Sequence, residues 1–313
     1  LSPEIRRQSL IAGLLAFLVF MAGVYGQAPI GFDARFVLFA QEMLRHGPTV
    51  FPTTYGQPYA DYSAVSTLFI WLLSLPFGTV NAFTAWAPSA VAGALIVTLM
   101  YRLLAPYSRR WALISIALLM LTSGFVTEVR AVSQDLMLAA VAFAVFYLGY
   151  AHEHFAGRRH WPLIFALLLL GFGIRGPIGL VVPTGMLCSY YLLNREWSRL
   201  LVFGVLASLL LAACVGLLLW LAKLSGGPVF LQDVIRMQFM GRMDGSEGVS
   251  GSLYYFTSSF GNYALAYPLA LLVLVAAWLS KPQQRGPALR LVQYCAAAGL
   301  IVMVGLSIPQ AKK

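Results

Sequence analysis

The sequence predicts an all-α membrane protein, a polytopic transmembrane helical bundle of about nine spanning helices with amphipathic juxtamembrane helices on its outer face. The first observation is composition: 60% of the 313 residues are hydrophobic and 10% are charged, whereas soluble domains carry roughly 25% charged residues. The second is a mean hydropathy of +0.79, concentrated in long apolar runs that need lipid as their solvent. The third is that short basic loops separate these runs, as on the cytoplasmic side of membrane proteins.

The basic loops also account for the net charge of +10. The Lys and Arg residues form no stripe with interleaved aromatic side chains on a soluble segment, so we expect no nucleic-acid partner. All three cysteines lie inside apolar runs and are interpreted as small core residues. They indicate neither a disulfide framework nor a metal cluster.

The spanning helices follow from the apolar runs in chain order. The first run is interpreted as a retained helix, because it is long for the core of a signal peptide and ends without a small-residue cleavage site. The run 161–193 would be about 50 Å long as one helix, too long for a bilayer, so it is divided at a hinge around Arg175. The predicted spans are 8–26, 82–104, 110–127, 132–150, 161–174, 177–193, 200–224, 262–280 and 290–307.

The distribution of charge sets the topology. Arg6 and Arg7 place the N-terminus in the cytoplasm, and the later basic loops fall on the same side only if the run 63–79 dips into the outer leaflet and returns. Most carboxylates then lie outside, some at membrane depth, where they are costly unless they pair or bind a ligand. The outer carboxylates are Asp33, Glu42, Asp61, Glu128, Asp135, Asp233, Asp244 and Glu247. Solvation of a loop suffices to explain Asp244 and Glu247.

The first outer segment, 27–80, contains a predicted amphipathic helix over 31–45. Asp33 falls in its first turn, where a carboxylate either complements the helix dipole or is held at the membrane surface as a base. Tyr55 and Tyr59 follow, and they could form an interfacial aromatic belt or stack on a sugar ring.

The turn between the third and fourth spans contains Glu128 and Arg130, and Asp135 begins the fourth. A structural ion pair is the simpler interpretation of these charges. Arg175 lies among glycines, where a phosphate could approach closely and bind its guanidinium through two hydrogen bonds. The second long outer segment, 225–262, is predicted to act as a lid.

These motifs, in this order, resemble the membrane glycosyltransferases of the GT-C type over essentially the whole chain. The nearest relatives in pattern are the lipid A aminoarabinose transferases and the dolichyl-phosphate-mannose protein mannosyltransferases. The pattern consists of Asp33 in the first outer loop, Gly56-Gln57-Pro58-Tyr59, Arg130…Asp135, Arg175-Gly176-Pro177 and Ser307-Ile308-Pro309. The chain departs from it at Asp33-Ala34, where the family often has Asp-Glu, and at Asp61-Tyr62-Ser63, where it often has Lys-Pro-Pro. The last motif also suggests that the natural protein continues beyond Lys313.

The resemblance implies an inverting transfer of sugar from a polyprenyl-phosphate donor to an acceptor hydroxyl. Asp33 is then the general base. Because the family's lysine is absent here, the donor phosphate is assigned to Arg175, Arg130, Lys312 and Lys313. The sugar and the acceptor are assigned to Asp61, Asp135, Tyr55, Tyr59 and Glu128.

The resemblance further implies one GT-C-like domain over 1–313, in a bacterial inner membrane, with its site facing the periplasm. The expected partners are membrane lipids, the lipid-linked donor and a lipid, glycan or protein acceptor. A divalent metal could bind carboxylates this close, but arginine makes it unnecessary, so no cofactor is expected. The alternatives are a secondary transporter, which would place its charges at the midplane, and a non-catalytic protein that binds the lipid carrier and would not need Asp33.

Overall fold

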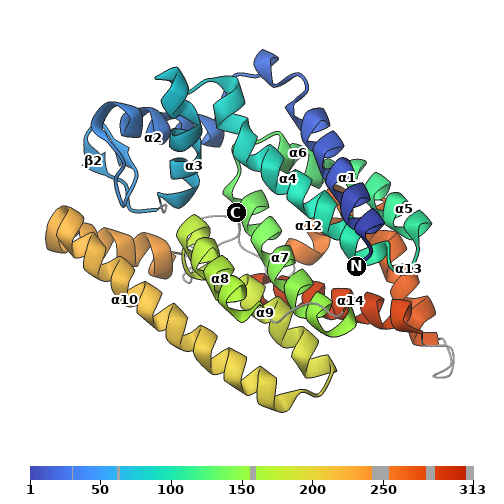
Figure 1. Ribbon diagram of the computed structural model, residues 1–313. Helices are drawn as coiled ribbons and strands as arrows, with labels where there is room; N and C mark the ends of the chain where they lie inside the picture. Colours follow the sequence, from blue (N-terminus) through green and yellow to red (C-terminus); the bar gives the residue numbers. More distant parts are fainter. Residues whose placement is uncertain (30, 62–63, 156–159, 242–253, 280–285, 308–313) are drawn as a thin grey trace.

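The computed structural model describes the chain except residues 30, 62–63, 156–159, 242–253, 280–285 and 308–313. Apart from one short β-hairpin, the regular elements of the described residues are helical (Figure 1). The hairpin pairs β1 (Thr53–Thr54) with β2 (Gln57–Pro58). The helices are α1 (Pro3–Met21), η1 (Val24–Gly26), α2 (Phe32–His46), α3 (Val65–Ser74), η2 (Leu75–Phe77), α4 (Ala82–Leu104), α5 (Arg109–Met120), α6 (Ser123–Val129), α7 (Gln134–His154), α8 (Trp161–Arg175), α9 (Pro177–Leu193), α10 (Trp197–Ile235), η3 (Arg236–Met240), α12 (Tyr254–Asn262), α13 (Ala266–Leu279) and α14 (Pro287–Ser307).

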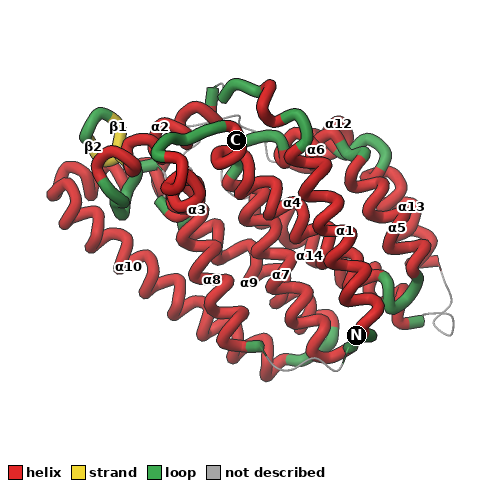
Figure 2. Tube along the Cα trace, turned by 45° about the horizontal axis from the view of Figure 1, so that its top comes forward, coloured by secondary structure: helices red, strands yellow, loops and turns green. Residues whose placement is uncertain are grey.

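The centre of the bundle is formed by α4 and α7, which have more buried residues than any other of the described helices. Helix α1 packs on α4, α4 packs on α7, and α7 packs on α8 and α9; α9 also contacts α10 and α14. Helices α10 and α13 expose many Leu and Val side chains, as expected of surfaces that face lipid. The N-terminus lies at one end of the bundle, whereas α2, the β-hairpin, α6 and α12 lie at the other (Figure 2).

The membrane-spanning character of the chain is confirmed. Within its described part, five segments are long and apolar enough to cross a membrane, namely Pro3–Gly26, α4, α7, Trp197–Met240 and α14. Two bent pairs bring the number to seven: α5 with α6, at 72°, and α12 with α13, at 111°. Helices α8 and α9, of 15 and 17 residues, are apolar but shorter. The predicted count of about nine requires these two to cross as well, and it remains a prediction.

The predicted division of the run 161–193 agrees with the structure. Helix α8 ends at Arg175 and α9 begins at Pro177. Gly176 between them has φ +65° and ψ −146°, a conformation that glycine adopts without a steric penalty. The two helices then fold back on each other closely, because a methyl group at Gly171 or Gly179 would overlap the backbone of the other.

The predicted dipping segment forms α3 and η2. Helix α3 has 10 residues, about 15 Å in length, which is half of a bilayer core. It packs against α2 and α4 and reaches α8.

The predicted lid, 225–262, differs most from expectation. The helix expected to end at 224 does break there, because Gly226 and Gly227 have non-helical backbone angles, and a second helical section of α10 runs on to Ile235. Pro228 begins the new helical section, because proline is well tolerated in the first turn of a helix. The π-helix η3 follows, and α12 is a helix that was not predicted. Asp244 and Glu247 lie outside the described residues.

Candidate functional site

Helix α2, at the end of the bundle opposite to the N-terminus, carries Asp33 (Figure 2). Its apolar side, which includes Phe36, Phe39 and Met43, is buried against α3 and α4, and this fixes the rotation of the helix. Asp33 is half-buried in the first turn. Its Oδ1 accepts a hydrogen bond of 3.0 Å from the backbone N–H of Val132. A residue of the first outer segment therefore contacts the start of α7, 99 positions along the chain.

The end of α6 and the turn to α7 contain three further polar groups. Ser133 caps α7: its Oγ accepts from the backbone N–H of Asp135 at 3.1 Å and donates to Glu128. Glu128 was expected in a turn but lies in α6. Arg130 ends that helix, and its guanidinium donates to the carbonyl of Ala22 at 3.3 Å.

Arg175 reaches α7 from the end of α8. Its Nε lies 3.2 Å from Asp135 Oδ1, and its Nη1 donates to Gln134 Oε1 at 3.0 Å. The Arg175 side chain is 18% exposed, whereas that of Asp135 is 60% exposed, so the pair is open on the carboxylate side. Gln134 is buried, and its amide nitrogen donates to Ser66 Oγ of α3 at 2.6 Å.

Sequence reasoning missed Gln134, because an amide at the start of an apolar helix carries no charge signal. Its position directly before Asp135, in the turn already selected for its charges, is the one feature that could have identified it. The arrangement fixes the guanidinium plane of Arg175, because Asp135 lies along its Nε–Nη2 edge and Gln134 accepts from Nη1.

The electrostatics agree with a single cluster of these groups. Burial raises the pKa of Asp33, and the hydrogen bond from Val132 partly offsets this. Burial also raises the pKa of Glu128; the hydrogen bond from Ser133 lowers it, the charges of Asp135 and Asp33 raise it further, and Arg175 lowers it. A carboxylate with a raised pKa is a stronger base than a free one, which suits it to accept a proton from a hydroxyl group.

The other predicted site residues are placed differently. Tyr59 packs on Phe39, with ring centroids 5.3 Å apart, and its hydroxyl accepts from Arg35 Nη1 at 3.1 Å. Tyr55 is 91% exposed at the tip of the hairpin. Asp61 is buried, and its carbonyl accepts a hydrogen bond from Gln238. The structure therefore brings together four of the predicted residues, Asp33, Glu128, Asp135 and Arg175, whereas Lys312 and Lys313 lie outside the described residues.

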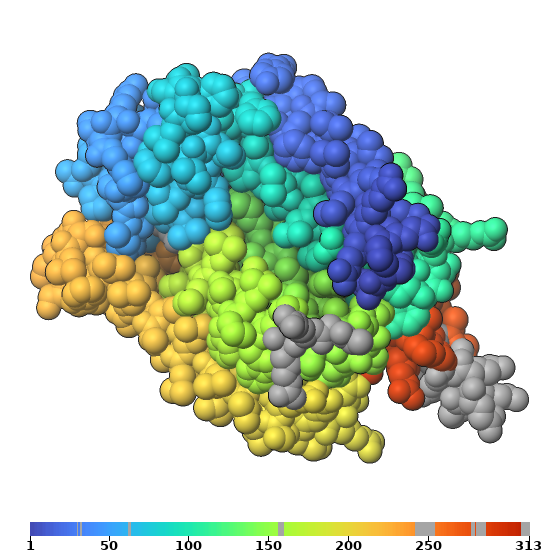
Figure 3. All heavy atoms as spheres, viewed as in Figure 1, coloured from blue at the N-terminus to red at the C-terminus, as the bar shows by residue number. Residues whose placement is uncertain are grey.

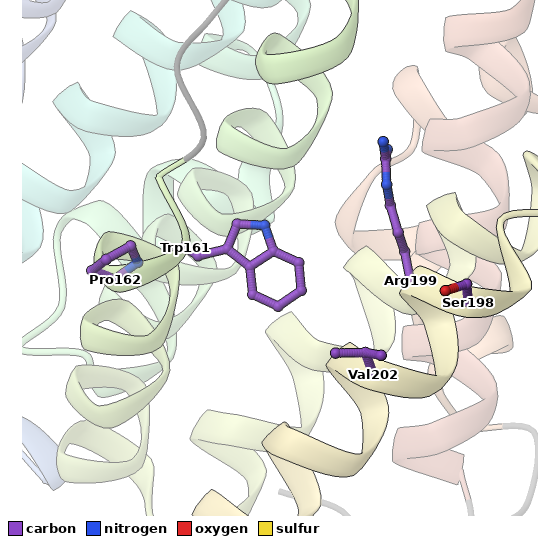
Figure 4. A pocket seen from close by; sticks show the side chains of 5 residues that line it. All are labelled: Trp161, Pro162, Ser198, Arg199 and Val202. Atoms are coloured by element: carbon purple, nitrogen blue, oxygen red, sulfur yellow. The ribbon is translucent and has the colours of Figure 1, made fainter.

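No metal site is evident in the part of the chain that the structure describes: there, no three His, Cys, Asp or Glu side chains could hold one ion. A cavity of about 500 Å³ lies between α8 and α10, lined by Trp161, Pro162, Ser198, Arg199 and Val202 (Figure 4). It adjoins the first turn of α8, whereas Arg175 ends that helix. The cavity is therefore remote from the carboxylate cluster.

Two solved membrane-protein structures share the fold of this chain, whereas curated sequences do not match it. No curated protein sequence matches the chain. Two solved structures resemble it, ArnT from Cupriavidus metallidurans bound to undecaprenyl phosphate (TM-score 0.74, 19% identity) and the same protein in the apo state (TM-score 0.73, 17% identity). The alignments cover 98% and 97% of this chain but 56% and 55% of those chains, so this chain spans little more than half of their length. At such identities the likeness establishes the helical membrane fold.

The sequence itself establishes the family. Residues 61–220, slightly more than half of the chain, match the family described as dolichyl-phosphate-mannose-protein mannosyltransferase. The matched region runs from just before α3 into α10, and it includes the turn that contains Glu128 and Asp135 and the hinge at Arg175. The chain is an integral membrane protein that belongs to the dolichyl-phosphate-mannose-protein mannosyltransferase family.

Proposed function

We propose that the protein is an inverting glycosyltransferase, which moves a sugar from a polyprenyl-phosphate donor to an acceptor hydroxyl at the outer face of the membrane. Family membership supports glycosyl transfer. The ArnT structure with bound undecaprenyl phosphate supports a polyprenyl-phosphate donor. The single observation that carries the proposal is the group of three carboxylates beside one largely buried arginine at one end of the bundle.

Asp33 is the general base of the proposed reaction. It removes the proton from the acceptor hydroxyl while the acceptor oxygen attacks the anomeric carbon of the sugar. The bond between that carbon and the phosphate oxygen breaks, and its electron pair leaves with polyprenyl phosphate. Attack from the face opposite to the leaving group inverts the anomeric centre. The raised pKa of Asp33 supports this role, because the carboxylate holds a transferred proton more firmly.

Arg175 binds the donor phosphate and stabilises the negative charge that develops on it. Fixed donors aimed at developing charge contribute strongly to catalysis, because they need no reorganisation during the reaction. Gln134 and Asp135 already fix the orientation of the guanidinium, through Nη1 and through Nε and Nη2. Arg130 contributes a second positive charge, and Lys312 and Lys313 are proposed to add to it.

The remaining residues orient the sugar and the acceptor. Asp135 and Asp61 orient the sugar or the arginines, and Glu128, Tyr55 and Tyr59 contribute to binding. The helices η3 and α12 of the segment 225–262 cover the acceptor, which is a lipid, a glycan or a protein. Residues 1–313 form one GT-C-like domain in a bacterial inner membrane, with the site on the periplasmic face.

The test is the release of polyprenyl phosphate from short-chain polyprenyl-phosphate sugars by the purified full-length protein. We expect release by the wild type and its loss in Asp33→Asn and Arg175→Ala. A folded wild type that releases no polyprenyl phosphate from any donor, with a range of acceptors, would remove the transferase proposal.

A further inference from the structure

Gln238 links two outer segments that are far apart in the sequence. It lies in the π-helix η3, directly after α10, and is 6% exposed. Its Nε2 donates to two carbonyls of the first outer segment, that of Ala60 at 3.1 Å and that of Asp61 at 2.7 Å. Figure 3 shows the light blue atoms of this segment lying against the orange atoms at the end of α10. The two surfaces share a small apolar cluster that includes Phe51 and Phe230.

The oxygen of the same amide is unsatisfied. Among the described residues, Gln238 Oε1 is buried and has no hydrogen-bond partner. It faces the turn that follows Arg175, because a Cβ atom added to Gly176 would lie 3.1 Å from it. A buried acceptor without a partner is costly, and native proteins retain such groups chiefly where function requires them. The π-helical turn that presents it is also rare and occurs frequently at functional sites.

The orientation of the amide is determined by its surroundings. Exchanging the nitrogen and the oxygen would point the oxygen at two carbonyl oxygens and would lose both hydrogen bonds. The group that faces Gly176 is therefore an acceptor. A phosphate oxygen cannot satisfy it, because a phosphate diester carries no proton at neutral pH. A sugar hydroxyl can donate to it.

We propose that Gln238 Oε1 accepts a hydrogen bond from one hydroxyl of the donor sugar, and that Gln238 thereby selects the sugar. The inference rests on the proposed function, in which Arg175 holds the donor phosphate. The sugar is bonded to that phosphate, so its ring lies beside the Arg175–Gly176 turn. In the ligand-free chain the oxygen is covered, and the sugar enters with a local shift of η3.

The experiment uses the full-length protein and short-chain polyprenyl-phosphate sugars that the wild type turns over. For each ring hydroxyl, kcat/KM is compared between the parent donor, the deoxy donor and the deoxyfluoro donor. Fluorine does not donate a hydrogen bond. With the wild type, kcat/KM should therefore be about tenfold lower for both analogues than for the parent donor at one ring position. With Gln238→Met, kcat/KM for the parent donor should be about tenfold lower than with the wild type. For the two analogues at that position, kcat/KM should be the same with the variant as with the wild type.

Gln232→Met is the matched control, because Gln232 is an exposed glutamine at the end of α10, directly before η3. It should keep the preference of the wild type. If Gln238 had only a structural role, Gln238→Met would slow all donors equally, and that result would overturn the inference while leaving the transferase intact. The inference would also be overturned by the wild type alone, if at no ring position both the deoxy and the deoxyfluoro donor had a lowered kcat/KM. No turnover of any donor would instead remove the transferase itself.

Discussion

The substitution Asp33→Asn tests the assignment of the base with little change to the structure. The bond to Asp33 is donated by the backbone N–H of Val132, and the amide oxygen of asparagine can accept it as well. Volume and hydrogen bonding are kept, and only the negative charge and the basicity are lost. Removal of a general base costs roughly 10²–10⁴-fold, which corresponds to about 3–5 kcal/mol of transition-state stabilisation.

The thermal stability of Asp33→Asn should not fall with its activity. Burial raises the pKa of Asp33, so folding holds the ionised carboxylate in a less favourable environment than water does. The variant should therefore unfold at the same temperature as the wild type or a higher one at pH 7. Loss of activity together with retained stability separates a chemical role from a structural one.

The assay is the release of polyprenyl phosphate, with circular dichroism to follow thermal unfolding. Asp233→Asn is the matched control, because Asp233 is an exposed carboxylate near the outer end of α10. We expect it to keep wild-type activity. An Asp33→Asn enzyme with more than half of the wild-type rate would refute the base assignment and leave Asp33 as a charge at a helix N-terminus.

Three further substitutions address the support of the site. Gln134→Met removes the acceptor of Arg175 and should lower kcat/KM by about 10–100-fold, because a hydrogen bond to a charged group contributes about 1.5–3 kcal/mol; steady-state kinetics measure it. Glu128→Gln should raise the unfolding temperature at pH 7, and the gain should vanish as the pH falls through the raised pKa of Glu128, because only the ionised form is destabilising. Gly179→Ala should destabilise the protein by about 1–3 kcal/mol or more in chemical denaturation, whereas Gly204→Ala should not, because an added methyl group there meets open space.

The bundle could be predicted because its signals are local. Apolar runs and basic loops place most helices within a few residues, and the Gly-Pro pair after Arg175 marks the hinge. The break of α10 at Gly226 and Gly227 agrees with the predicted end of that helix. The helical section that starts directly after it at Pro228 was missed, because the contacts that stabilise this section come from a distant segment. Phe230, for example, packs on Phe51.

The candidate site could be predicted in its charges but not in its uncharged parts. Asp33, Asp135 and Arg175 are conspicuous, since carboxylates and arginines are rare in an apolar chain. Gln134 and Gln238 carry no charge, and their importance depends on which groups they meet after folding. An amide in a helix is most often a surface residue, so only the folded structure distinguishes these two.

The short lengths of α8 and α9 have a consequence for how the membrane meets the protein. With 15 and 17 residues, they extend about 22 and 25 Å, against a hydrocarbon core of about 30 Å. If the start of α8 and the end of α9 lie at the inner boundary, the Arg175–Gly176 turn between them lies several ångströms below the outer boundary. The bilayer beside α8 and α9 must become thinner to match the length of these helices. A phosphate on a polyprenyl tail can then reach Arg175 while the tail stays at its normal depth, so turnover should fall when the protein is reconstituted in thicker bilayers.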